Sequence, residues 1–176
     1  MNDISAYDAI KDQMNTGDII EFQGTSIISK EIRARTGFDT NHSALVVVMK
    51  SPYTGLTRRY MYEAVNDGVD PNYLSVVLSK YDGVAFWYPM RNENVPRIPE
   101  VEERAFQYLG VAYDYKGLIT NLFGHGHINT HALFCSEFVQ LCWGGTEQDT
   151  AWWPGEIIEK MNLWKFPRVQ LMKEAL

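Results

Sequence analysis

Cysteine is scarce in this sequence, which has only two among its 176 residues, Cys135 and Cys142. On a helix, a separation of seven residues would place their Cα atoms about 10 Å apart, which is beyond the reach of a disulfide bond. We therefore expect both side chains to be free thiols, as is usual in a reducing compartment.

Long apolar runs are also missing. The longest spans residues 44–49, far short of the roughly 20 residues that a membrane-spanning helix needs. Residues 1–18 have no basic stretch followed by an apolar one, so no signal peptide is expected. Together with the free thiols, these features predict a cytoplasmic protein without integral membrane association.

Positive charge is limited, because 16 Lys and Arg residues face 22 Asp and Glu residues, a net charge of -6. Nucleic acids and anionic membranes attract basic surfaces, so this balance argues against either as the main partner. The length suits a single domain of residues 1–176, and a hydrophobic content of 45% is enough for a core. The oligomeric state is left open.

Hydrophobic patterning predicts a strand-rich first half and a second half with two strong helices. The expected strands are residues 19–22, 41–49, 59–65, 73–78 and 83–90. The expected helices are residues 5–14, 26–35, 101–109, 134–143 and 154–161. Residues 110–133 are rich in Gly, His and Asn and predict a long loop, which is often functional when it lies beside a site.

Cys135 has the position expected of a nucleophile. It begins the helix predicted for residues 134–143, where the N–H groups and the helix dipole favour a thiolate. Its own backbone N–H is placed to donate to an oxyanion. The alternative is a buried core thiol, the usual fate of a free cysteine, and we expect that role for Cys142 in the middle of the helix.

A thiol nucleophile needs a base, and the base needs an acceptor that orients it. His42 lies at the start of the apolar strand 41–49, which would hold it firmly. Glu63 lies in the apolar segment 61–65, where a carboxylate needs a partner. The alternatives are a surface histidine at a strand start and a structural ion pair between Glu63 and an arginine.

Several segments together resemble the circularly permuted branch of the NlpC/P60 papain-like superfamily, and most of all its YiiX/YaeF group, which has poxvirus relatives. The match covers about residues 16–163 and is most specific at Phe-Cys-Ser-Glu-Phe-Val (134–139) and Gly-Val-Ala-Tyr-Asp (110–114). Weaker matches are Thr-Gly-Asp-Ile-Ile (16–20), Asn-His-Ser-Ala-Leu (41–45) and Tyr-Glu-Ala (62–64). The resemblance implies an α+β, circularly permuted papain-like fold, with the nucleophile helix packed on an antiparallel sheet.

The resemblance also implies roles for individual residues. Cys135 would be the nucleophile, His42 the base and Glu63 the third member of a Cys-His-Glu triad. Tyr113 would lie near the oxyanion, and Asp114 would be structural. The implied activity is that of a cysteine hydrolase, an amidase or peptidase that cleaves an amide bond of a peptide or peptidoglycan-like substrate through a thioester and needs no cofactor.

Other activities of the same site remain open. Lecithin retinol acyltransferases, in the same branch, have an Asn-Cys-Glu-His-Phe-Val type of motif, whereas this chain has Phe-Cys-Ser-Glu-Phe-Val, which favours a hydrolase. An ester or lipid acyltransferase or a thioesterase is the alternative on this site. Trp152 and Trp153 precede Pro154 in an expected loop, and we expect them to contact substrate.

Two readings without thiol catalysis compete with the hydrolase. His127, His131 and Cys135 are spaced four apart, with His125 nearby, and on a helix they would share one face as metal ligands. The surrounding glycines do not favour a helix there. The second reading is a binding module, in which aromatic side chains such as Trp152 and Trp153 wall a groove that only holds a ligand.

Overall fold

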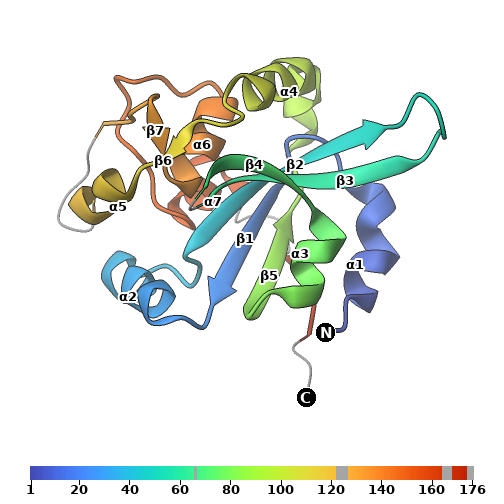
Figure 1. Cartoon of the computed structure of the whole chain (residues 1–176), viewed down its shortest axis with the longest axis horizontal. Coiled ribbons are helices and arrows are strands. Elements are labelled where there is room, and N and C mark those ends of the chain that lie inside the picture. Colours follow the sequence, from blue (N-terminus) through green and yellow to red (C-terminus); the bar gives the residue numbers. More distant parts are fainter. Residues whose placement is uncertain (66, 122–126, 164–167, 174–176) are drawn as a thin grey trace.

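The structure, a computed structural model, describes residues 1–65, 67–121, 127–163 and 168–173. Within these residues, the main sheet has six antiparallel strands in the order β4-β3-β2-β1-β5-β8 (Figure 1). Its strands are β1 (Ile19–Gly24), β2 (His42–Lys50), β3 (Thr57–Val65), β4 (Gly68–Tyr73), β5 (Gly83–Tyr88) and β8 (Val169–Gln170). The expected α+β class with an antiparallel sheet is therefore confirmed.

The sheet is covered on both faces, and β2 shows why its sequence is apolar without alternation. Leu45 and Val47 belong to one buried cluster, and Ala44 and Val46 belong to the other. A strand with two buried faces needs apolar side chains at odd and even positions alike. The uninterrupted run at residues 44–49 is the result.

Helices form the two outer layers. The cluster around Leu45 is completed by α4 (Ile98–Gln107), α6 (Cys135–Cys142) and α7 (Glu156–Lys160), and the opposite cluster by α1 (Ser5–Ile10) and α3 (Leu74–Lys80). Figure 1 shows α2 (Ile27–Thr36) and α5 (Tyr115–Asn121) near the same end of the sheet. The short elements are the 3-10 helices η1 (Lys11–Gln13) and η2 (Asn92–Arg97) and the strands β6 (Ala112–Tyr113) and β7 (Ala132–Leu133).

The prediction of a strand at residues 73–78 is wrong. The strand is β4, which ends at Tyr73, and the segment continues as the helix α3. Leu74 and Leu78 are four residues apart and both fully buried, whereas Val76 is 46% exposed. Burial at this helical spacing outweighs the strand preference of the neighbouring valines.

The helix α6 connects the fold to the candidate site. It packs on β2 and β3 and against α4, and all of its residues are buried. The helix follows β7, which pairs in parallel with β6, so that its first residue lies at the end of the sheet where β2 begins. Among the described residues, the helices are too short or too polar to cross a bilayer.

Candidate active site

A cleft of about 420 Å³ opens at the end of the sheet where β2 begins, and Cys135, His42 and Glu63 all line it. Its walls come from α2, β2, β3, the segment around Tyr81, β6, α5 and α6. The other lining residues are Ile28, Ser29, Ile32, Asn41, Ala64, Val65, Asp67, Tyr81, Tyr113 and Leu118. The structure therefore brings the three expected triad residues together, although they are separated by up to 93 positions in the chain (135 minus 42).

His42 and Glu63 form a close pair. Nε2 of His42 lies 2.6 Å from Oε2 of Glu63, and their side chains are 18% and 10% exposed. The other carboxylate oxygen, Oε1, accepts a hydrogen bond of 3.4 Å from the amide of Asn72 on β4. With Nε2 engaged by a carboxylate, the remaining ring nitrogen, Nδ1, is the one left for a thiol.

Cys135 interacts with the same imidazole. Burial lowers the pKa of His42, but the negative charge of the Cys135 thiolate, a hydrogen bond with that sulfur and the bond with Glu63 outweigh burial and hold the pKa well above its ordinary value. The imidazole also packs against the ring of Phe22, with 5.6 Å between ring centroids. An imidazole that bonds a carboxylate on one side and a cysteine sulfur on the other is arranged to take up the proton of that cysteine.

The helix α6 is fixed at its first turn by Glu137. Its Oε2 accepts a hydrogen bond of 3.1 Å from the backbone N–H of Phe134, the residue before Cys135. Glu137 is 1% exposed, and burial together with the nearby Asp114 carboxylate raises its pKa to about 8, against the opposing effect of the Phe134 N–H. This carboxyl group therefore fixes the backbone of Phe134, the residue that precedes α6.

Tyr113 lies on β6 and lines the cleft, as expected. Burial and the negative charges of Cys135, Glu137 and Asp114 raise the pKa of its phenol, so the hydroxyl stays protonated at neutral pH and can donate a hydrogen bond. Asp114 has a local role, since its Oδ1 accepts a hydrogen bond of 2.6 Å from the N–H of Gly117 at the start of α5.

Sequence reasoning did not identify Tyr81 or Asn72. Tyr81 lines the cleft, and burial together with the charges of Glu63 and Cys135 raises its pKa. Asn72 reaches Glu63 only because β4 pairs with β3. Neither lies in a motif, and the register of strand pairing is what brings them to the site.

The expectation for two tryptophans is corrected. Trp152 lines a separate cavity beside Trp143 and Gln140, at the other end of α6, and its backbone N–H bonds the side chain of Gln140 at 3.1 Å. Trp153 is 8% exposed and faces the ring of Phe134 with 6.2 Å between centroids. Neither belongs to the lining of the cleft, because Trp152 lies in the separate cavity and the ring of Trp153 packs in the core on Phe134.

The histidines of the alternative metal reading do not share a helix face. His127 and His131 are exposed, residues 132–133 form a strand, and Cys135 is buried. His127 Nδ1 lies 3.2 Å from the carbonyl oxygen of Gln148. His125 lies outside the described residues. Within those residues, no three His, Cys, Asp or Glu side chains gather closely enough to hold a metal ion.

The fold is similar to that of YiiX. The solved structure of the metalloprotein YiiX from Escherichia coli O157:H7 matches with a TM-score of 0.58 and 24% sequence identity, over 74% of this chain and 65% of that chain. The resemblance to the YiiX/YaeF group that the sequence motifs indicate is thus confirmed in the fold.

The likeness to YiiX concerns architecture. This chain spans about two thirds of the length of YiiX. No family model matches the sequence. No curated protein matches it either. The roles of Cys135, His42 and Glu63 therefore depend on the geometry of the cleft itself.

Proposed function

We propose that this protein is a cysteine hydrolase with Cys135 as nucleophile, His42 as base and Glu63 as the residue that orients the base. The observation that carries this proposal is that a thiol, an imidazole and a carboxylate line one cleft, with His42 interacting with Cys135 and contacting Glu63 at 2.6 Å. The imidazole has a partner on each side, as thiol acyl transfer requires.

The proposed reaction begins with transfer of the Cys135 thiol proton to His42. The thiolate attacks the substrate carbonyl carbon and forms a C–S bond, while the carbonyl oxygen becomes an oxyanion. The N–H of Cys135 at the helix N-terminus and the hydroxyl of Tyr113 donate to this oxygen. The intermediate collapses as His42 protonates the leaving amine, and water then hydrolyses the thioester with His42 as base.

We also propose that the fold is the circularly permuted form of the papain-like architecture. The supporting observation is chain order: the strands that carry His42 and Glu63 come first, and the helix that carries Cys135 comes last. In the permuted branch that the sequence resembles, the histidine sheet likewise precedes the cysteine helix.

For the substrate, we propose an amide in a peptide or peptidoglycan-like molecule. The cleft also has an apolar side, because Ile28, Ile32 and Leu118 line it and Ile28 is 67% exposed. This lining suits an apolar group next to the bond that is cleaved. It gives weight to the alternative of an ester or thioester substrate with an aliphatic acyl chain.

The description of YiiX as a metalloprotein makes metal binding the other function to test. In this chain the metal reading rests on His125, His127, His131 and Cys135. The described members of that set do not converge, which favours the hydrolase.

The proposal is tested by intact-mass labelling with a panel of amide, ester and thioester acyl electrophiles. We expect one acyl adduct per chain in the wild type and none in Cys135→Ala, with Cys142→Ala as the matched control that still labels. Labelling should persist in excess chelator, and the fastest probe identifies the bond class. Equal labelling of wild type and Cys135→Ala, or labelling that a chelator abolishes, would overturn the proposal.

A further inference from the structure

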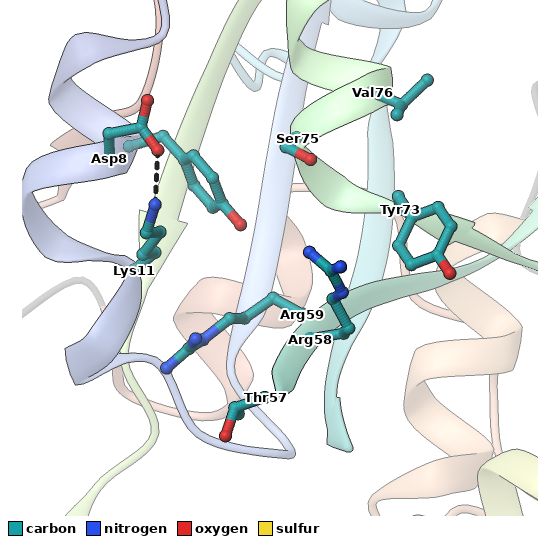
Figure 2. A pocket seen from close by; sticks show the side chains of 9 residues that line it. Asp8, Lys11, Thr57, Arg58, Arg59, Tyr73, Ser75 and Val76 are labelled. Carbon is teal, nitrogen blue, oxygen red and sulfur yellow. Dashed lines mark hydrogen bonds and ion pairs between the residues drawn. The ribbon is translucent and has the colours of Figure 1, made fainter. Parts of the chain in front are cut away.

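A second cavity lies away from the cleft, between β3, the α1–η1 segment and the start of α3. Its volume is about 400 Å³, and none of its lining residues belongs to the cleft. Figure 2 shows that its polar side chains come from all three elements. The lining residues are Tyr7, Asp8, Lys11, Thr57, Arg58, Arg59, Tyr73, Ser75 and Val76.

Arg59 is the most unusual residue of this cavity. Its side chain is only 10% exposed, and its Nε atom is buried without a hydrogen-bond partner in the described part of the chain. The ion pair that Arg59 makes among these described residues joins Nη2 to Asp12 at 2.9 Å, and that carboxylate is 83% exposed and therefore well screened by solvent. A nearly buried guanidinium with an unsatisfied donor is costly unless an anion supplies further acceptors.

Positive charge gathers around Arg59, although the chain as a whole is acidic. Lys11, Arg58 and Arg59 all line the cavity. Asp8 forms an ion pair with Lys11 at 2.7 Å, and Asp12 forms one with Arg59. No ion pair of Arg58 is found within residues 1–65, 67–121, 127–163 and 168–173. In Figure 2, Arg59 reaches from β3 toward the segment of Lys11, and the guanidinium of Arg58 points toward Ser75.

We propose that this cavity binds a phosphate-type oxyanion, as a phosphate monoester or an anionic phosphate headgroup. Two guanidinium groups offer fork-shaped sets of donors that match phosphate oxygens, and the hydroxyls of Thr57 and Ser75, which also line the cavity, add neutral donors. A soluble phosphorylated molecule and a lipid headgroup present the same chemistry. Leu56, which precedes Thr57 of this cavity in the chain, is 53% exposed, and Tyr53 in the same β2–β3 turn is 96% exposed.

The first experiment titrates the labelled protein with inorganic phosphate at constant ionic strength and follows amide chemical shifts. We expect saturable shifts at residues 57–59 and 73–76, with a dissociation constant in the millimolar range or tighter. Arg58→Gln and Arg59→Gln should each weaken binding on the order of ten- to a hundredfold, and Arg59→Lys should weaken it less. Arg35→Gln, which removes the same charge from α2, should bind as the wild type does.

Arg58 is exposed, so its substitution decides the question even if Arg59→Gln does not fold. Shifts that do not saturate, or equal affinity in Arg58→Gln and the wild type, would overturn the site.

A second experiment compares sedimentation of the protein with phosphatidylcholine vesicles that contain or lack phosphatidic acid. Sedimentation that depends on phosphatidic acid and on Arg58 identifies a lipid headgroup. Phosphate binding without sedimentation identifies a soluble phosphate ester. Acyl-electrophile labelling of Cys135 should be unchanged in every variant, which separates this site from the proposed hydrolase.

Discussion

The two cysteines of α6 have different surroundings, although both are buried. Cys135 lines the cleft and interacts with His42, whereas Cys142 is fully enclosed in the core. Burial raises the pKa of the Cys142 thiol, so at neutral pH it holds little thiolate. The same helix therefore carries one thiol suited to chemistry and one that serves packing.

This contrast predicts selective alkylation. Iodoacetamide at neutral pH should modify Cys135 much faster than Cys142, because thiolate character and access through the cleft both favour Cys135. Peptide mapping by mass spectrometry measures the two rates. His42→Ala should slow the modification of Cys135 and leave Cys142 unchanged. Faster modification of Cys142 would rule out Cys135 as the nucleophile.

Replacing Glu63 tests how the imidazole is held. Glu63→Gln keeps a hydrogen-bonding group near Nε2 of His42 but removes the negative charge, so turnover should fall roughly ten- to a thousandfold while folding changes little. The carboxylate raises the pKa of His42, so its loss should lower that pKa.

The pH dependence of turnover shows in which direction the pKa of His42 changes in Glu63→Gln. Activity needs a protonated imidazole beside the thiolate, so the alkaline limb of the rate profile reports the loss of that proton. In Glu63→Gln the alkaline limb should move to lower pH than in the wild type. Wild-type turnover with an unmoved alkaline limb would show that Glu63 does not orient His42.

At the scale of elements, α6 depends on a carboxyl group at its first turn. Because the pKa of Glu137 is raised to about 8, this side chain is mostly protonated at pH 7. Glu137→Gln resembles the protonated acid and should be close to wild type. Glu137→Ala leaves the N–H of Phe134 without its acceptor and should cost about 1–3 kcal/mol in the free energy of unfolding.

If Glu137 only stabilised the fold, Glu137→Ala would change the free energy of unfolding alone. The experiment therefore also measures the reactivity of Cys135. We expect slower iodoacetamide modification of Cys135 and lower turnover, because the start of the helix is no longer fixed. Urea denaturation and alkylation kinetics measure the two effects on the same samples. Alkylation at the wild-type rate in a folded Glu137→Ala protein would show that Glu137 does not position the thiol.

The elements that the sequence predicted well are those whose local pattern agrees with their burial. The strand β2 is an apolar run, and α6 has apolar residues at helical spacing, at positions 135, 138, 139, 141 and 142, so the predicted bounds of both agree with the structure within a residue or two. The segment after Tyr73 was misassigned, because its valines favour a strand while the burial of Leu74 and Leu78 at helical spacing requires a helix. The strand preference of individual residues is overridden where packing between distant elements determines the secondary structure.

The site shows the same division. Cys135, His42 and Glu63 could be proposed from the sequence because they lie in short motifs, and the structure brings them to one cleft. Asn72 and Tyr81 join the site through strand register and the end of a helix, which no motif marks. Trp152 lines a separate cavity and Trp153 packs on Phe134, and both placements depend on tertiary packing that no local pattern indicates.

At the scale of the whole molecule, a buried carboxyl group should make stability depend on pH. Glu21 on β1 is fully buried, accepts hydrogen bonds from Ser43 Oγ at 2.5 Å and from the N–H of Gly155 at 3.1 Å, and has its pKa raised by burial from 4.5 to about 7. Between these pH values the native state binds more protons than the unfolded state, so stability falls as pH rises.

A shift of this size corresponds to roughly 3 kcal/mol, which is lost by pH 8. Glu21→Gln should remove this part of the pH dependence and so unfold with a smaller difference between pH 5 and pH 8 than the wild type. Urea denaturation at the two pH values measures the difference for each protein. An identical pH dependence in both proteins would contradict the assignment, and Glu31→Gln on the exposed surface of α2 is the matched control.

The arrangement of the sheet also bears on the order in which the proposed site would assemble during translation. Five of the six strands, β1 to β5, lie within residues 19–88 and are adjacent in the sheet. These residues leave the ribosome well before α6 does, and chains acquire structure from the N-terminus as they emerge. The imidazole and its carboxylate therefore meet first, and the thiol arrives last. A nascent chain would carry no activated nucleophile until α6 docks on the finished sheet.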